Sequence, residues 1–477
     1  MNMSWSVKLI EAIKSVLLVV LLLFTILLLY LFWGSASFKN NAGEDAPRRE
    51  TIPAIEILQP DRIEVCFGGD VYTVIDNNFK IMMDSFKAFS GSRNLSVEEI
   101  SQASYEETLK QPSIKAVFEY FIPFGAVCEI YAIDRISGAD AINALSELAY
   151  AARYDDRLFV KDANAGKYYV IVGSVSRGFD ALKDEIDNSK NSGFTYFPLG
   201  KYVGGESRVL CPESFESSIS DTVYSRENFS RRPGNGAELI IKSFFSDNFD
   251  FVRRIEEESG TTIYMYGYGK IVVIARGDGT LEFKMEDEER SSSQLKYLDA
   301  FERANAFIAA HGAFSAVDGM SFRPYIKEVQ TDPAGKKGFR FIFGIKVNGE
   351  KIYYQSEAPV IIDVTGGRVS YFKRNLINIS PREFRNTDGD YRVTYPALNM
   401  LAGSFEYIIR VLAENRIIDK TDFSFEDLAE MVESFNSGYV RPDRSDGLLK
   451  AAWVVSIGGL EFYFGLDDGK PLGYHNN

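Results

Sequence analysis

Histidine, the side chain that most often performs acid-base or metal chemistry, occurs only twice among the 477 residues of this chain. His311 falls at the expected end of a helix, and His475 lies in the C-terminal tail. A Ser-His-Asp triad needs a histidine between a nucleophile and an acid, and a zinc site needs several His or Cys ligands. The sequence therefore predicts neither a triad nor a histidine-based metal site.

Carboxylate side chains are abundant, and a pair of them can act as general acid and base. The densest groups are Asp155 with Asp156, residues 256–258 and residues 286–289. Counting alone leaves a catalytic dyad open, but these runs fall in expected loops or on helix surfaces, where charges are normally solvated. We interpret them as solvated surface, and we expect no enzyme activity.

Glycine-containing turns are a second type of candidate ligand site. Gly267, Gly269 and the segment 277–279 lie between expected strands, without the helix N-terminus that a phosphate site uses, so hairpin turns explain them better. The polar stretch 386–390 resembles a calcium loop but lacks the closing Glu of an EF-hand, and a type I turn is favoured. We expect no cofactor and no bound metal.

The three cysteines, Cys66, Cys128 and Cys211, are widely spaced and form no CxxC pair. Their number is odd, which argues against a disulfide framework in an exported protein. We interpret them as small buried hydrophobic residues, with one Cys66–Cys128 disulfide as the alternative.

Tyr264, Tyr266 and Tyr268 alternate along an expected strand and would share one of its faces. Exposed aromatic side chains in such a row could bind peptidoglycan, peptide or polysaccharide. A half-buried sheet face explains the same pattern and is favoured. An exported binding module of the cell envelope therefore remains the alternative function.

The element that organises the whole chain is an apolar segment at residues 16–33. It contains apolar side chains and Thr25, without charge, Pro or Gly, and as a helix it is long enough to cross a hydrocarbon core. It also exceeds the roughly 7–15 apolar residues of a secretory signal. We predict a retained transmembrane helix; a cleaved signal is the alternative, because small residues follow the segment.

The orientation of this helix is not decided by the basic residues, which flank it on both sides. A short basic head, one span and a long passenger match a signal anchor, whose passenger is exported largely regardless of charge. We therefore expect a single-pass protein of the cell membrane, with residues 1–15 in the cytoplasm and the chain after Ser35 outside it.

The span lacks a small-xxx-small pattern, so contact with partner helices would use interdigitated aliphatic side chains. The candidate interface and anchor residues are Val16, Val20, Leu23, Thr25, Leu27, Tyr30 and Trp33. Thr25 either donates a hydrogen bond across a helix interface, for roughly 0.6–2 kcal/mol, or bonds the i−4 carbonyl of its own helix. Tyr30 and Trp33 would anchor the outer membrane interface.

The composition argues against nucleic acid or an anionic lipid surface as a partner. The chain has 67 acidic and 53 basic residues, a formal charge of −14, and no basic cluster of five or more residues. Such a balance favours a soluble ectodomain on a membrane tether.

The fold class predicted for the passenger is α+β, with antiparallel sheets that bury one face against helices. About 440 residues need two or three cores. We expect a stalk at 34–54, an N-terminal α+β domain at 55–205, a central β-rich domain at 206–290 and a C-terminal α+β domain at 291–477.

Local patterns place the elements within these domains. Gly277, Asp278 and Gly279 predict a hairpin turn, as do Asn348 and Gly349. Ser96 with Glu99 at capping-box spacing predicts a helix start, residues 127–133 a strand, and residues 425–435 a helix.

Several segments, in this order and spacing, carry a family resemblance. They are the N-terminal span, Pro112 to Phe118 with Ile122 and Pro123, Phe244 to Asp247 with Val252 and Arg253, Tyr264 to Gly267, residues 272–274, Gly279 to Phe283, residues 339–347, Gly366 to Val369, and Gly438 and Tyr439 ahead of Ala452 and Trp453. Over nearly its whole length the chain resembles the YycH family of membrane-anchored regulators of the WalK (YycG) sensor histidine kinase. Its C-terminal third also resembles the companion regulator YycI.

This resemblance implies an extracytoplasmic ectodomain without an enzymatic role. Together with a YycI-like companion protein, it would adjust a WalK-like sensor histidine kinase that governs cell-wall metabolism. The family's transmembrane helix is thought to pack beside the spans of the kinase, and its ectodomain is thought to pair with the companion ectodomain.

Overall fold

The computed structural model describes most of the chain after residue 50 and part of the apolar segment before it. The described residues are 17–18, 20–22, 24–25, 51–75, 79–91, 95–133, 136–174, 177–190, 195–213, 216–217, 219–227, 229, 235–286, 295–316, 321–356, 358–379, 392–419, 423–442 and 447–476.

The expected transmembrane helix lies largely outside these residues, as do Val16, Leu23, Leu27, Tyr30 and Trp33 of its candidate interface. The described part is helical and its large apolar side chains are exposed, among them Val20. No helix made of described residues has the length and apolar character needed to cross a bilayer. A transmembrane role for residues 16–33 therefore stays a prediction.

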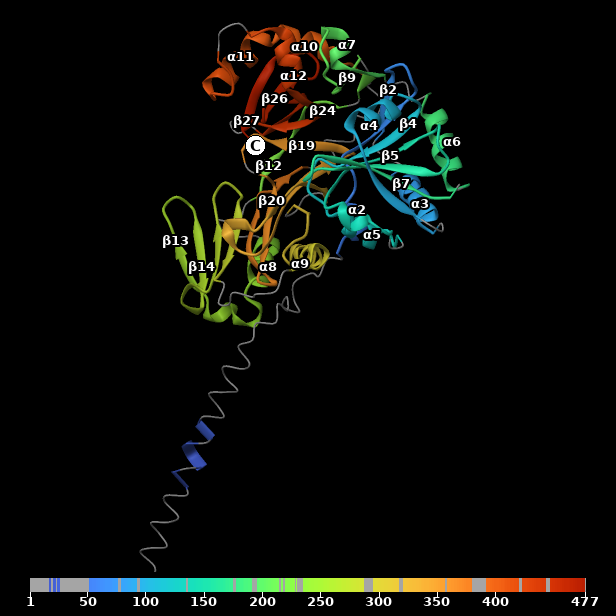
Figure 1. Cartoon of the computed structure of the whole chain (residues 1–477). Helices are drawn as coiled ribbons and strands as arrows, with labels where there is room; N and C mark the ends of the chain where they lie inside the picture. Colours follow the sequence, from blue (N-terminus) through green and yellow to red (C-terminus); the bar gives the residue numbers. More distant parts are fainter. Residues whose placement is uncertain are drawn as a thin grey trace, which may run out of the picture.

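The first half of the body is built on one antiparallel sheet of nine strands, at the right in Figure 1. In spatial order the strands are β3 (Ser96–Ile100), β7 (Lys167–Val172), β6 (Arg157–Asp162), β5 (Leu145–Ala151), β4 (Ser113–Val117), β1 (Arg62–Cys66), β2 (Tyr72–Ile75), β8 (Tyr196–Pro198) and β9 (Leu210–Pro212). The helices of this half are α2 (Ala54–Ile57), α3 (Phe79–Ser90), α4 (Gln102–Leu109), α5 (Phe124–Ile130), α6 (Asp180–Ser189) and α7 (Leu199–Val203).

The two faces of this sheet differ in chemistry. Alternate residues such as Ile63 and Val65 of β1 belong to the main core, into which α3 and α6 also place their apolar side chains. The residues between them, such as Arg62 and Glu64, point to the opposite face, because successive side chains of a strand alternate. Helix α4 packs on that second face, where Tyr105 contacts Phe159.

The second half is a sheet of fourteen strands. Its strands are β11 (Thr222–Val223), β13 (Arg253–Glu256), β14 (Thr262–Tyr266), β15 (Ile271–Ala275), β16 (Leu281–Met285), β17 (Arg323–Thr331), β18 (Gly338–Val347), β19 (Glu350–Tyr354), β20 (Val360–Thr365), β21 (Arg368–Arg374), β24 (Val432–Arg441), β25 (Leu448–Ile457), β26 (Leu460–Gly465) and β27 (Pro471–Asn476). Neighbours are antiparallel except β19 and β24, which are parallel. Two short pairs join β10 (Glu216–Ser217) to β23 (Arg392–Val393) and β12 (Ser225–Arg226) to β22 (Ile377–Asn378).

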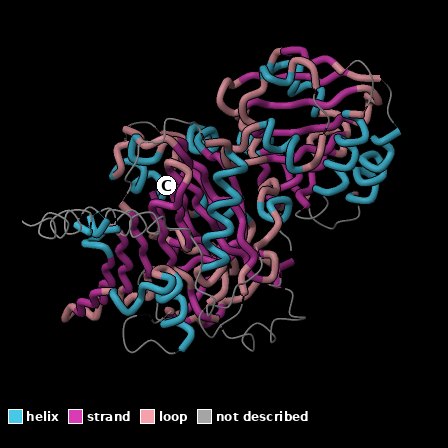
Figure 2. The backbone as a smooth tube through the Cα atoms, turned by 90° about the horizontal axis from the view of Figure 1, so that it is seen from below, coloured by secondary structure: helices cyan, strands magenta, loops and turns pink. Residues whose placement is uncertain are grey.

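Helices cover one face of this sheet as well. They are α8 (Asn235–Ser243), α9 (Tyr297–Ala310), α10 (Ala397–Gly403), α11 (Phe405–Glu414) and α12 (Phe425–Met431). The long helix α9 contacts β18, β20 and β21, and Figure 2 shows helices lying against the strands in both groups. Mixed α+β architecture with large antiparallel sheets is thus confirmed.

Short 3₁₀ helices occur in the connections. They are η1 (Ala139–Ala141), η2 (Arg177–Phe179), η3 (Ser246–Phe251), η4 (Gly267–Gly269) and η5 (Pro333–Gly335). Strand β16 pairs with β21, so the large sheet continues across residue 290, where we placed a domain boundary. The division into domains stays a prediction.

Three element predictions were wrong. Residues Ser96–Ile100 form β3, and the helix begins later, where Ser101 Oγ accepts a hydrogen bond from Ser104 N at 3.2 Å. Two serines compete as caps, and pairing of β3 with β7 decides between them.

Residues 127–133 do not form a strand, because Phe124–Ile130 is the helix α5 after Pro123. Its β-branched residues suggested a strand, but burial of Phe124, Ala126 and Val127 stabilises a helix here. Helix α12 starts at the Ser424–Asp427 capping box as a helix should, but it ends at Met431 and not at 435, since Val432 begins β24.

Candidate functional site

The residues that suggested chemistry in the sequence do not come together. His311 is buried at the C-terminal end of α9, with its ring centre 4.0 Å from that of Phe307 and 4.2 Å from that of Phe244. Cys66, Cys128 and Cys211 are all free thiols, so the alternative of a Cys66–Cys128 disulfide was wrong. Within the described ranges, no three His, Cys, Asp or Glu side chains are placed to share a metal ion.

His311 should make stability depend on pH. Burial lowers the pKa of its imidazole from 6.5 to about 4, against hydrogen bonds to backbone oxygens that raise it. Because this pKa is depressed in the folded protein, burial of the neutral imidazole is compatible with full stability above pH 6.5. As pH falls from 6.5 toward 4, the unfolded chain binds a proton that the folded chain does not, and the free energy of unfolding decreases. The shift corresponds to about 3 kcal/mol.

Denaturant unfolding at several pH values tests this expectation. Between about pH 6.5 and 4, His311→Phe should reduce the slope of the free energy of unfolding against pH by the equivalent of close to one proton taken up on unfolding. His475→Phe, in the terminal strand, should not change this slope. Identical pH profiles of the His311 variant and the parent protein would contradict the expectation.

The other sequence candidates are surface or turn residues. Residues 256–258 are exposed and lie at the end of β13, while residues 386–390 and most of 286–289 lie outside the described residues. Gly267 and Gly269 form a turn between β14 and β15, as expected. Tyr264 is buried and Tyr266 half-buried, and only Tyr268 is exposed, so these tyrosines do not form an exposed aromatic row.

A group that we did not predict is the row of charges on the second face of the nine-stranded sheet. Lys161 Nζ lies 3.1 Å from Glu147 Oε1, and Glu147 Oε2 lies 3.5 Å from Lys115 Nζ. Lys115 Nζ is also 2.8 Å from Glu64 Oε2, whose other oxygen is 2.8 Å from Arg62 Nε. The row crosses four strands, because the register places Lys115 beside Glu64 and Lys161 beside Glu147.

The row ends at a junction with the fourteen-stranded sheet. Arg62 also pairs with Glu119, whose backbone N–H donates to Asp61 Oδ2 at 2.8 Å. Asp61 Oδ1 in turn lies 3.1 Å from the ammonium of Lys351 on β19. The side chains of Asp61 and Lys351 are only 7% and 13% exposed, so this ion pair is buried between the two sheets.

The electrostatics of these groups follow from burial and from their partners. Burial alone would raise the pKa of Glu64, but Lys115 and Arg62 outweigh it and lower the pKa from 4.5 to about 2. Burial likewise opposes ionisation of Glu147, and Lys115 with Lys161 outweighs it, so its pKa is lowered. Burial dominates at Asp61, whose pKa is raised despite Lys351.

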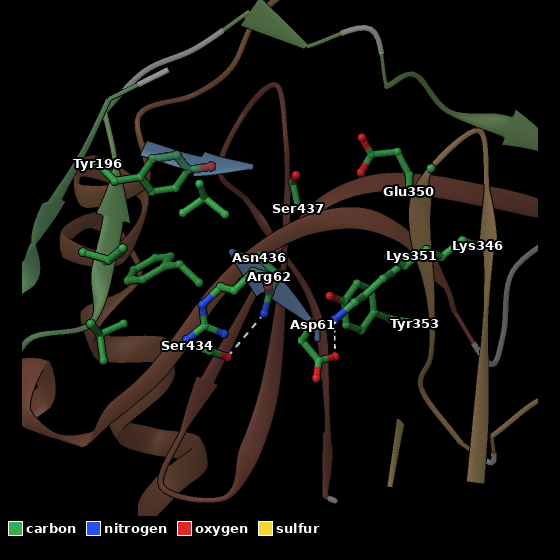
Figure 3. A pocket seen from close by; sticks show the side chains of 15 residues that line it. Asp61, Arg62, Tyr196, Lys346, Glu350, Lys351, Tyr353, Ser434, Asn436 and Ser437 are labelled. Carbon is green, nitrogen blue, oxygen red and sulfur yellow. Dashed lines mark hydrogen bonds and ion pairs between the residues drawn. The ribbon is translucent and has the colours of Figure 1, made fainter. Parts of the chain in front are cut away.

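Two adjoining cavities open at this junction, which we call the inter-sheet cleft. Their volumes are about 210 Å³ and 420 Å³, and both are lined by Asp61, Lys351, Tyr353, Ser434 and Asn436. Figure 3 shows the smaller one, with dashed lines from Asp61 to Lys351 and between Asn436 and Ser434. A third cavity of about 230 Å³ lies under α4 along the charged row.

Tyr325 on β17 forms another wall of the cleft. The Lys351 ammonium lies 5.0 Å from the centre of its ring, within cation-π range. The ring covers Gly344, its cross-strand partner on β18, which has no room for a Cβ. A glycine at this position therefore lets the tyrosine lie flat beside the Asp61–Lys351 pair.

The cleft is suited to binding and to holding the sheets together. The carboxylates of its interior are ion-paired, Asp61 with Lys351 and Glu461 with Lys327 at 3.3 Å. Its hydroxyl groups belong to serines and tyrosines, and the sole buried histidine of the described residues, His311, is not among its lining residues.

Solved structures give one informative likeness. The chain is similar to YycH from Bacillus subtilis, with a TM-score of 0.57 and 8% identity, covering 89% of this chain and 98% of that one. An uncharacterized protein from Eubacterium rectale, 12% identical, matches 54% of this chain and 82% of its own at a TM-score of 0.31, too low to indicate a shared fold. No family model and no curated protein matches the sequence. The chain therefore has a YycH-like fold.

Proposed function

We propose that this protein is a non-enzymatic, membrane-anchored regulator of a two-component sensor histidine kinase that controls cell-wall metabolism. The observation that carries the proposal is the YycH-like fold, which extends over 89% of this chain and 98% of the solved one. The sequence resembles the same family in segments spread over nearly its whole length. In this proposal the large body lies outside the cytoplasm, and a WalK-like kinase and a YycI-like protein are its partners.

The apolar segment 16–33 has a defined part in this proposal. It anchors the body and contacts the spans of the kinase through aliphatic side chains. Thr25 Oγ1 donates to Leu21 O at 2.8 Å, which is the intrahelical bond that we considered as one alternative. The hydroxyl is thereby satisfied within its own helix.

Exchange of segment 16–33 for an unrelated Leu-rich span should change the output of the kinase in cells, because the specific side-chain contacts are lost while anchoring is kept. Transcription of a gene controlled by the cognate response regulator is the measurement. Thr25→Val is the matched control and should leave the output as it was, since the hydroxyl is already bonded to Leu21. Unchanged output after the exchange would show that helix contacts do not carry the signal.

The partners can be tested separately by mild crosslinking of intact cells followed by purification of the full chain. We expect a sensor histidine kinase and a second single-span protein in the crosslinked material. Recovery of cell-wall saccharide in place of a kinase would favour the alternative of an envelope binding module. The structure offers that alternative little support, because Tyr264 is buried and Tyr266 half-buried.

A further inference from the structure

The end strand of the fourteen-stranded sheet leaves one edge without a neighbour. β13 pairs with β14 on one side, and no described strand lies on its other side (Figure 1). The backbone N–H of Glu257 donates to Thr261 O at 2.9 Å, so these two residues form a hydrogen-bonded pair of the hairpin. Because such pairs alternate along an antiparallel ladder, the N–H and C=O groups of Arg254 and Glu256 point away from β14, toward the open edge.

One face of this end of the sheet carries apolar side chains that lie outside the core. They are half-buried, and none belongs to a buried cluster or packs against one: Ile255, Ile263, Met265, Val272 and Ile274. The register aligns Ile255, Ile263 and Ile274 in one row across β13, β14 and β15. A further strand at the edge of β13 could extend this row and remove apolar surface from water.

The residues on either side of Ile255 form a charge pattern that is complementary to itself. Two arginines precede Ile255 and glutamates follow it, so residues 253–257 are in turn basic, basic, apolar, acidic and acidic. If two such strands pair antiparallel about Ile255, residues equally distant from it lie opposite each other. Arg254 would then face the partner's Glu256, and Arg253 would face the partner's Glu257.

The same charges disfavour other registers. The free backbone groups belong to Arg254 and Glu256, so the pairing can shift only in steps of two residues. A shift one way places Arg254 opposite the partner's Arg254, and a shift the other way places Glu256 opposite the partner's Glu256. Like charges directly opposite each other destabilise a strand pair. Charges normally keep an edge strand from pairing, whereas these favour a single self-pairing.

We propose that β13 is a dimerisation edge, at which a second copy of this chain pairs with it antiparallel about a two-fold axis beside Ile255. Such an interface uses the same residues of both copies, as closed symmetry requires. Ile255 would contact the partner's Ile255 and join the isoleucine rows of the two copies. The side chains of Arg254 and Glu256 are 47% and 65% exposed, so both are accessible to a partner.

Sedimentation equilibrium of the purified full chain in detergent measures this association. We expect a monomer–dimer equilibrium with a Kd on the order of 10 µM, because one short strand pair buries less surface than a permanent dimer does. Added salt should weaken the association, since the arginine–glutamate contacts lie at an exposed edge.

Charge reversal on either side of Ile255 tests the register. Arg254→Glu would face the partner's Glu256 with like charge, and Glu256→Arg would face the partner's Arg254, so each variant should self-associate about tenfold more weakly than the parent. An equal mixture of the two variants restores opposite charges at both positions and should associate as the parent does. Lys80→Glu and Asp84→Lys, which reverse an exposed ion pair on α3, are the matched controls and should self-associate like the parent, alone and mixed.

A cysteine at the two-fold axis gives a second, covalent test. Ile255 and the partner's Ile255 would form a non-hydrogen-bonded pair with Cα atoms about 4.5 Å apart, within the range of a disulfide. Ile255→Cys should therefore yield a disulfide-linked dimer on mild oxidation. Glu256→Cys is the matched control on the same strand, because two copies of residue 256 would lie roughly 7–8 Å apart, too far for a disulfide. The parent, with its three free cysteines, should yield no such dimer.

Three results would each overturn the proposal. They are a mixture of the charge-reversed variants that associates no better than either alone, crosslinking of Glu256→Cys equal to that of Ile255→Cys, and oxidation of intact cells that links Ile255→Cys to another protein in place of a second copy. The dimer goes beyond the proposed regulation of a kinase, and its tests do not depend on that function, which is measured by kinase output.

Discussion

Arg374→Met should lower the free energy of unfolding by about 3–5 kcal/mol, because it removes one partner of a buried ion pair, the guanidinium that lies against the carboxylate of Glu227. Both side chains are fully buried, and Arg374 Nη2 lies 2.8 Å from Glu227 Oε1. The same guanidinium donates to the carbonyl oxygens of Ser315 at 2.8 Å and Ala313 at 3.2 Å. It therefore fixes three parts of the chain: β21, the segment that contains Glu227, and the turn after α9.

Chemical denaturation of the full chain in mild detergent measures the effect. The double variant Glu227→Gln with Arg374→Met should be less destabilised than the sum of the two single variants, because it removes both charges of the pair. Lys80→Ala breaks the exposed Lys80–Asp84 pair, whose side chains are 83% and 62% exposed, and serves as the matched control. Its effect should stay below about 0.5 kcal/mol. A cost for Arg374→Met as small as that of the control would contradict the burial of this pair.

Hairpin turns that require particular backbone dihedral angles could be predicted from local sequence alone. Asn348 and Gly349 join β18 to β19 with φ values of 52° and 88°, as a type I′ turn requires. The glycines at 277 and 279 likewise predicted a hairpin turn, and residues 277–279 do lie in the turn that joins the antiparallel strands β15 and β16. Such turns were predictable because three or four neighbouring residues determine them.

Elements decided by distant pairing were not predictable in this way. Ser96 and Ser101 both carry capping side chains, and only the pairing of Ser96 with Val172 on β7 shows which one begins a helix. Likewise, Val432 continues a helical pattern, but it pairs with Ile457 and so begins β24. Tertiary pairing overrides local propensity at both places.

The charged row and the cleft were missed for the same reason. Lys115 and Glu147 look like ordinary exposed charges on alternating strands, which is how solvated sheet faces appear in a sequence. Their closeness depends on the register of β1, β4, β5 and β6, and Asp61 meets Lys351 across 290 positions of sequence. The sequence does show an acidic residue, Asp61, directly before the strand β1, but this position alone does not indicate that Lys351 is its partner.

Lys351→Met should be the most informative change at the inter-sheet cleft, because it removes the cation of a buried pair that joins the two sheets. The carboxylate of Asp61 would then be buried beside Glu119 without the cation of Lys351. We expect this to lower the free energy of unfolding by about 3–5 kcal/mol at neutral pH. Burial already raises the pKa of Asp61, and Lys351 lowers it, so the substitution should raise that pKa further.

The sign of the pH effect distinguishes this change from a simple loss of packing. With its folded pKa above the unfolded value of 3.8, Asp61 destabilises the variant at high pH, and stability should recover as pH falls through the raised folded pKa. Asp61→Asn with Lys351→Met should be more stable than Lys351→Met alone at pH 7 and should lack this recovery. Hydrogen exchange of the amides at the start of β1 and along β19 should accelerate in the single variant and return toward the parent rate in the double variant, because the sheets separate only when a bare carboxylate must reach water. Equal stability of the two variants at pH 7 would mean that Asp61 is solvated without its partner and that the pair does not hold the sheets together.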